Sequence, residues 1–175
     1  MSDRRRHAAR VLPSLGPAVL ALAEADLLAP TVETSPNDGP RVREYLAAVG
    51  ADAPADWGPA AVSAWILWAA AAAGRVAPVV GSADAPTLIA QFKLARRWIP
   101  IHQLAQGVVQ PGMVVGYRIA PIPSVPKRRV GVVRAVLAAG ASFEVIFGNA
   151  GAGRDRVAVE ARAFTDPLFA GAGGL

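Results

Sequence analysis

The first hundred residues carry the spacing of apolar side chains that is typical of α-helices. Residues 17–28 and 41–49 repeat apolar positions three and four residues apart, which predicts two helices. Residues 59–73 are apolar on nearly all faces, so they predict a helix at the centre of the domain. A fourth helix is expected from about residue 85 to 97, with Pro86 in its first turn.

Residues at the ends of these segments support their boundaries. Asp56 is a candidate N-cap for the central helix, and Ser82 and Asp84 precede the fourth helix. Gly50 is expected to stop the second helix, and Gly74 to end the central helix in the left-handed conformation.

After residue 107 the pattern changes to short runs rich in β-branched and aromatic residues, which predict strands. These runs are residues 113–119, 130–137, 143–147 and 157–161. Segments rich in Pro and Gly separate them. Helices followed by strands predict an α+β domain, in which a helical N-terminal half packs on a small antiparallel sheet.

The two ends of the chain differ in composition from the segment between them. Residues 1–16 form a basic arm, residues 17–169 a single domain, and residues 170–175 a Gly-rich tail without order of its own. Neither end has enough apolar area to offset an ordering cost of about 1–2 kcal/mol per residue. We therefore expect neighbouring chains to hold both ends, the alternative being that they fold back on their own domain. The candidate docking residues are Arg4, Arg5, Arg6 and Arg10.

Composition excludes several kinds of chemistry. The chain has no cysteine, so disulfides, thiolate–zinc sites and cysteine nucleophiles are impossible. It has two histidines, which excludes a His-rich metal site, and we expect no cofactor. The net charge of +5 permits an anionic partner, but solvated surface charge is the simpler interpretation. No aromatic residues interleave with the basic ones, so nucleic acid is an unlikely partner.

Two segments resemble membrane signals without matching them well. The arginines at residues 4–6 precede an apolar stretch, as in a secretory signal peptide, but Pro13, Gly16 and Pro17 interrupt it. Residues 57–74 carry no charge, yet a proline near their start and two interior tryptophans fit a buried helix better than a membrane span.

Several motifs, taken in order, resemble those of a known superfamily. Asn37-Asp38-Gly39-Pro40 is followed by Tyr45-Leu46, by Gly50 and then by Trp57-Gly58-Pro59-Ala60-Ala61-Val62-Ser63-Ala64-Trp65. This is similar to the papain-like cell-wall amidases and endopeptidases of the CHAP and NlpC/P60 superfamily. In those proteins a stretch N-x-G-P … Y-L … G leads to W-C-A-A-F-V-S-W, whose cysteine opens the central helix and is the nucleophile.

The resemblance continues into the strands and covers about residues 18–165. Residues 110–115 resemble the P-G-D-I-V-V that opens the family's sheet, and residues 129–133 resemble the H-V-G-I-V strand that carries the catalytic histidine. Residues 147–149 resemble a following E-G-N. The resemblance implies a papain-like fold and a cleft formed by four residues: Trp57, Gly58, Arg129 and Asn149.

Departures from the family's pattern imply that the domain is catalytically inactive. Gly58 stands at the nucleophile position and Arg129 at the histidine position, with Asn149 at the third catalytic position. Glycine has no side chain, and arginine is not deprotonated in proteins. Ser63 lies more than a turn farther along the helix, and His102 is expected to be a packed or capping residue.

Two other kinds of site receive less support. Asp56 and Asp84 could be a carboxylate pair for glycoside cleavage, but helix capping explains each of them. Residues 148–153 resemble a phosphate-binding loop without its Gly-Lys-Ser/Thr ending, so a hairpin loop is the better interpretation.

These observations favour a structural component of a phage virion, in the tail or baseplate, where domains resembling this family occur. One alternative is a bacterial pseudoenzyme, in the cytoplasm or envelope, that binds peptidoglycan or a protein partner. A further alternative is an active cell-wall hydrolase with an unrecognised mechanism. The expected partners are other virion or cell-envelope proteins, with peptidoglycan as a further candidate.

Overall fold

The computed structural model of the 175-residue chain describes residues 14–29, 33–104, 108–118, 128–137, 141–151 and 153–175. The expected docking residues Arg4, Arg5, Arg6 and Arg10 lie outside this part of the chain. The domain includes residues before the expected boundary at residue 16, because Leu15 is buried in the core and the first helix starts at Gly16.

The described residues form four α-helices and one six-stranded antiparallel sheet, which confirms the α+β class. The helices are α1 (Gly16–Leu28), α2 (Pro40–Ala48), α3 (Gly58–Ala72) and α4 (Ala85–Leu94). The strands are β1 (Trp98–Pro100), β2 (Val114–Arg118), β3 (Arg128–Leu137), β4 (Ser142–Ala150), β5 (Arg156–Ala163) and β6 (Phe169–Gly173). A 3-10 turn, η1 (Ile101–Gln103), follows β1. All four predicted helices and all four predicted strands are present.

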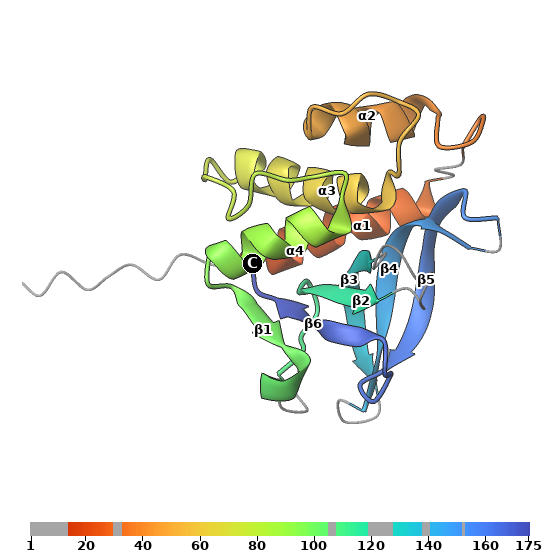
Figure 1. Cartoon of the computed structure of the whole chain (residues 1–175). Helices are drawn as coiled ribbons and strands as arrows, with labels where there is room; N and C mark the ends of the chain where they lie inside the picture. The colour runs from red at the N-terminus through yellow and green to blue at the C-terminus, as the bar shows by residue number, and fades with distance from the viewer. Residues whose placement is uncertain (1–13, 30–32, 105–107, 119–127, 138–140, 152) are drawn as a thin grey trace, which may run out of the picture.

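The helices form a layer on one face of the sheet, with α2 outermost on α3 (Figure 1). The strand order is β1-β6-β2-β3-β4-β5, so β2 to β5 form an antiparallel meander and β6 lies between β1 and β2. Among the described residues, no helix is both long and apolar enough to cross a membrane.

Helix α3 occupies the centre, as its uniformly apolar sequence predicts. Pro59 lies in the first turn, where a missing N–H costs no hydrogen bond. Trp65 and Ile66 are fully buried. Gly74 follows the helix with φ +61°, the left-handed conformation expected for it.

Alternation along the strands produces a core on each face of the sheet. On β3, Val130 and Val132 face the helices, while Val133 belongs to a second core on the opposite face. That second core includes aromatic side chains from three other strands: Tyr117, Phe143, Phe147 and Phe169. Buried residues on both faces explain why the strands read as nearly continuous apolar runs.

The expectation of a tail without order of its own at residues 170–175 is wrong. Phe169–Gly173 is strand β6, which pairs with β1 on one side and β2 on the other. Its small residues are required by close neighbours: a Cβ added at Gly171 would lie 2.4 Å from the carbonyl oxygen of Ile99. This end of the chain therefore folds back on its own domain, which was the alternative expectation.

Candidate functional site

Three of the residues singled out from the sequence meet around one small cavity of about 60 Å³. Gly58 comes from the start of α3, Arg129 from the start of β3 and Asn149 from the end of β4. The complete lining is Asp56, Gly58, Pro59, Arg128, Arg129, Val130, Gly148, Asn149 and Arg154. Helix, strand and hairpin residues that are far apart in the sequence thus form a single site.

Gly58 lies in direct contact with strand β4. A Cβ added to Gly58 would lie 2.9 Å from the carbonyl oxygen of Gly148 and 3.5 Å from Cβ of Asn149. Real Cβ atoms essentially never approach a backbone oxygen this closely, and the obstructing atom belongs to backbone rather than to the end of a flexible side chain, so it cannot move aside cheaply. The start of α3 therefore has no space for a nucleophilic side chain.

Asn149 holds the surrounding loops together. Its Nδ2 donates to Oδ1 of Asn37 and to Oδ1 of Asp56, both at 3.2 Å. The same Asp56 oxygen accepts from the backbone N–H of Gly58 at 3.2 Å. Asp56 therefore satisfies an N–H at the start of α3, as expected of a helix cap, although Trp57 is the residue at the N-cap position.

The side chain of Arg129 is directed away from α3. Arg129 is opposite Tyr117 on β2, and Nη1 donates to Oε1 of Glu160 at 2.8 Å. Its guanidinium carbon lies 4.1 Å above the ring centroid of Phe147, which belongs to the second core. Because strand side chains alternate, Arg128 rather than Arg129 shares the helix-facing side of β3 with Val130.

Trp57 does not line the cavity. Its side chain is fully buried and stacks on Tyr45 at a ring separation of 5.7 Å. Its Nε1 donates to Oε1 of Glu33 at 2.6 Å, and Oε2 of Glu33 accepts from the backbone N–H of Asn37 at 2.8 Å. Trp57 thus fixes the loop that carries Asn37, which in turn contacts Asn149.

The other candidate residues have structural roles or lie apart from the cavity. Ser63 is buried and its hydroxyl donates to the backbone carbonyl of Ser82 at 3.0 Å. Asp84 caps α4 by accepting from the N–H of Thr87, as predicted. His102, expected to be a packed or capping residue, is not packed, because it lies exposed in η1. The segment after Asn149 joins β4 to β5 as a hairpin, as expected.

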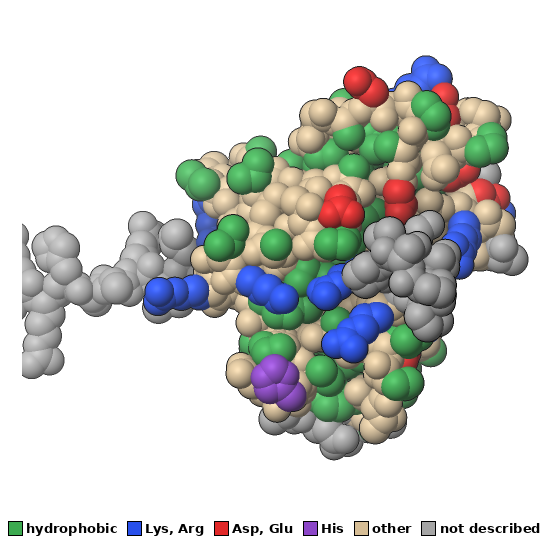
Figure 2. All heavy atoms as spheres, viewed as in Figure 1, with side chains coloured by type: hydrophobic (Ala, Val, Ile, Leu, Met, Phe, Trp, Pro, Cys, Tyr) green, Lys and Arg blue, Asp and Glu red, His purple; other side chains and the backbone are tan. Residues whose placement is uncertain are grey.

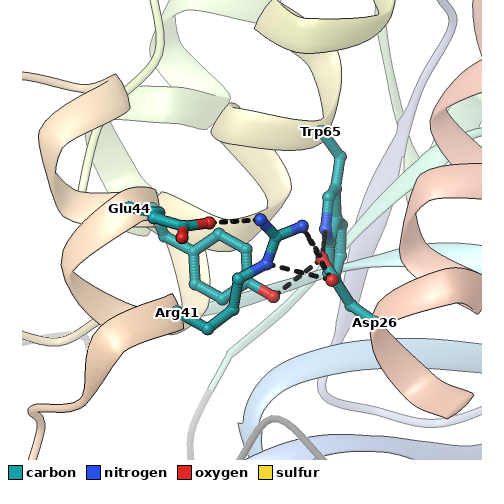
Figure 3. Close-up of polar contacts among 5 residues, drawn as sticks. Asp26, Arg41, Glu44 and Trp65 are labelled. Atoms are coloured by element: carbon teal, nitrogen blue, oxygen red, sulfur yellow. Dashed lines mark hydrogen bonds and ion pairs between the residues drawn. The ribbon is translucent and has the colours of Figure 1, made fainter. Parts of the chain in front are cut away.

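A buried carboxylate between helices α1, α2 and α3 was missed in the sequence. Asp26 on α1 is 5% exposed and accepts from three side chains (Figure 3). Tyr45 Oη donates at 2.8 Å, Trp65 Nε1 at 2.7 Å, and Arg41 forms a two-pronged ion pair with its closest contact at 2.8 Å. Asp26 shares a helical face with Val19 and Ala23, a signal that could have placed it in the core.

Ionisation in this cluster is shifted by burial and by charge. Burial raises the pKa of Tyr45 well above its usual value, and the nearby carboxylate of Asp26 raises it further. Burial alone would lower the pKa of Arg41, but its bonds to Glu44 and Asp26 raise it overall. Arg41 also lies 4.7 Å above the ring of Trp68. The cluster joins α1, α2 and α3 and has no open side for a substrate at Asp26.

Among the described residues, no group of His, Asp or Glu side chains is arranged to hold a metal ion. Comparisons of the chain with protein-family models, curated proteins and solved structures found no match.

Proposed function

We propose that this chain is a catalytically inactive, papain-like domain of the cell-wall-hydrolase type that serves as a structural component of a phage virion, in the tail or baseplate. The order of the sequence motifs supports this proposal. So does the geometry, because the start of the apolar central helix, the start of β3 and the asparagine of β4 surround one cavity. In the superfamily that the sequence resembles, a nucleophile, a base and an orienting residue are expected at these three positions around one cleft.

The contact between Gly58 and Gly148 is the observation that carries the inactive assignment. A nucleophile at this position needs a side chain that projects into the cavity. The carbonyl oxygen of Gly148 lies too close to leave space for the Cβ of such a side chain. The site is therefore closed to a nucleophile by its backbone packing, in addition to lacking the thiol.

The groups beside Gly58 are also unsuited to acid–base chemistry. Arg129 is paired with Glu160, and a guanidinium cannot act as a base near neutral pH. Asn149 is used in contacts with Asn37 and Asp56. Such a domain keeps its shape and surface without turnover, which suits a role in an assembly.

A cell-wall digestion assay tests the inactive assignment. Purified protein is incubated with peptidoglycan, and new amino groups and reducing ends are measured against a buffer blank. We expect no release of either. Release of amino groups would overturn the inactive assignment and favour a hydrolase with an unrecognised mechanism.

The virion assignment is tested separately by co-purification. Tagged protein expressed with candidate tail and baseplate proteins should elute with them in a complex of defined stoichiometry. Elution as a free domain in the presence of the whole set would count against a structural role.

The second candidate is a bacterial pseudoenzyme that binds peptidoglycan or a protein partner. The arginines around the cavity favour a binding role of this kind, since Arg154 is exposed and Arg128 half-buried. Sedimentation with purified cell walls distinguishes it: the domain should co-sediment with walls if it binds them and stay in the supernatant if its role is only structural.

A further inference from the structure

We infer that the cavity beside Gly58 is a binding site for a phosphate group, held by Arg128 and Arg154. This inference rests on the proposed function, because a cavity without a nucleophile is available for binding. The two arginines approach from different elements, Arg128 from the start of β3 and Arg154 from the β4–β5 hairpin.

Neither arginine has an acidic partner among the described residues. Other arginines nearby on the same strands are paired: Arg129 with Glu160, Arg134 with Glu24 and Glu144, and Arg156 with Asp155. Of the three arginines that line the cavity, Arg129 alone has an acidic partner among the described residues, and its side chain is directed into the second core.

A third arginine adds to the positive potential. Arg118 on β2 is directly opposite Arg128 in the antiparallel register, and it too has no acidic partner among the described residues. Directly opposed residues have Cβ atoms about 4.5–5.5 Å apart, and like charges at that spacing destabilise a sheet. A bound anion would remove this repulsion. On the face of the molecule that Figure 2 shows, Lys and Arg side chains form a band.

The size of the cavity limits what it can hold. Its volume of about 60 Å³ compares with about 10–15 Å³ for the smallest cavity that holds one water molecule. Cavities for drug-sized ligands are about 300–1,000 Å³. A single tetrahedral anion fits these dimensions, and a sugar ring or a base would have to stay outside.

A phosphate suits the charges better than a carboxylate does. Two guanidinium groups from different elements present more donors than the two oxygens of one carboxylate can accept, whereas a phosphate offers three terminal oxygens and up to two charges. Asp56 on the wall opposes an anion, but its Oδ1 already accepts bonds from Gly58 and Asn149. The N-terminal end of α3 adds a favourable partial charge.

Binding is tested by titrating the whole chain with inorganic phosphate, glycerol 3-phosphate and a short thymidine oligonucleotide, at constant ionic strength set with chloride. A titration with sodium acetate at the same ionic strength tests whether a carboxylate binds equally well. Isothermal calorimetry measures affinity, and the melting temperature gives an independent readout. The variants are Arg128→Gln and Arg154→Gln, singly and together. Arg156→Gln is the matched control, since it removes a paired arginine from the same hairpin.

We expect at least one phosphate arm to bind and to raise the melting temperature relative to chloride. The double variant should bind at least tenfold more weakly, while Arg156→Gln should bind as the wild type does. The arm that binds most tightly identifies the source of the phosphate. Equal responses of the wild type and the double variant, no response in any phosphate arm, or binding of acetate as tight as phosphate would each overturn the inference. Cell-wall digestion would overturn the inactive assignment alone, so the two failures are distinguishable.

Discussion

Gly58 at the start of helix α3 and Gly148 on strand β4 pack backbone against backbone. A Cβ added to Gly148 would lie 3.2 Å from Cα of Gly58, and one added to Gly58 would lie 2.9 Å from the oxygen of Gly148. Each glycine therefore allows the other element to approach, and together they set how closely the helix sits on the sheet. Both glycines line the cavity, so this contact forms part of its wall.

Gly58→Ala should destabilise the domain, although alanine is the better helix former. The propensity gain is at most about 1 kcal/mol, whereas overpacking against a strand backbone costs about 1–3 kcal/mol. Urea unfolding monitored by tryptophan fluorescence measures the difference. Gly174→Ala is the control, since a Cβ there meets nothing within 4 Å, and its change should stay within about 0.5 kcal/mol. A stabilising Gly58→Ala would show that the contact is looser than described.

Introducing the catalytic residues of the superfamily that the sequence resembles should not create activity. In the double variant Gly58→Cys with Arg129→His, the thiol has no space, and the new imidazole points toward Phe147 and Glu160 rather than toward α3. We expect no release of amino groups from peptidoglycan and a lower stability. The variant to compare with it is Gly58→Cys with Arg128→His, because residue 128 lies on the helix-facing side of β3. Activity of the 58/129 pair would mean that Arg129 is oriented toward the cavity.

Asp26→Asn should cost about 1.5–3 kcal/mol of unfolding free energy, because it removes the buried charge that accepts hydrogen bonds from Tyr45, Trp65 and Arg41. Glu24→Gln lies on the same helix and breaks only the exposed 3.3 Å pair with Arg134, so it should cost less than about 1 kcal/mol. Chemical unfolding at neutral pH compares the two. Equal losses would show that the cluster around Asp26 contributes no more than a surface pair.

The stability of the domain should fall steeply in alkali. Both tyrosines are buried, and burial raises the pKa of Tyr45 and of Tyr117 well above the usual value. The unfolded chain then loses these protons near pH 10 while the folded chain keeps them, so stability present below about pH 10 is lost above it. Each tyrosine contributes a slope of about 1.4 kcal/mol per pH unit.

Tyr117→Phe isolates one of these contributions, since its hydroxyl has no hydrogen-bond partner among the described residues. The variant should be about as stable as the wild type at pH 7 and should lose stability about half as steeply between pH 10 and 11. An unchanged slope would show that Tyr117 ionises normally in the folded protein.

Strand β6 should be essential to the isolated domain. Ala172 is fully buried in the second core, so Ala172→Asp places a charge there and should cost more than about 3 kcal/mol or prevent folding. Ala170→Asp in the same strand is only half-buried and should be milder. Circular dichroism and thermal melting measure both. A normal melt for Ala172→Asp would return support to the idea that a partner chain orders this segment.

Sequence patterns were sufficient to predict the helices and strands that are determined by their own residues. The apolar run of α3 and the β-branched run of β3 specify a helix and a strand locally. Strand β6 could not be found this way, because alanine and glycine carry no alternation and its order depends on β1 and β2. Strand β1 is only three residues long, too short for a period.

The sequence predicted which residues meet at the site better than it predicted the direction of their side chains. Gly58, Arg129 and Asn149 do surround one cavity, since the order of helix and strands brings their positions together. The face on which Arg129 lies depends on the pleat of β3, which sequence similarity alone does not give. Trp57 was placed in the cleft because of its motif, but its hydrogen bond to Glu33 holds it in the core.

The position of β6 also constrains the order of folding. Strand β1 pairs only with β6 among the described strands, so it has no partner while the chain is synthesised through β2, β3, β4 and β5. The meander of these four strands can close through neighbouring contacts, but β1 must wait beside α4 until Phe169–Gly173 emerges and inserts. Pairing so distant in sequence is slow to form. A ribosome-bound chain stalled before β6 would therefore display an open edge on β2, to which chaperones or other nascent chains have access.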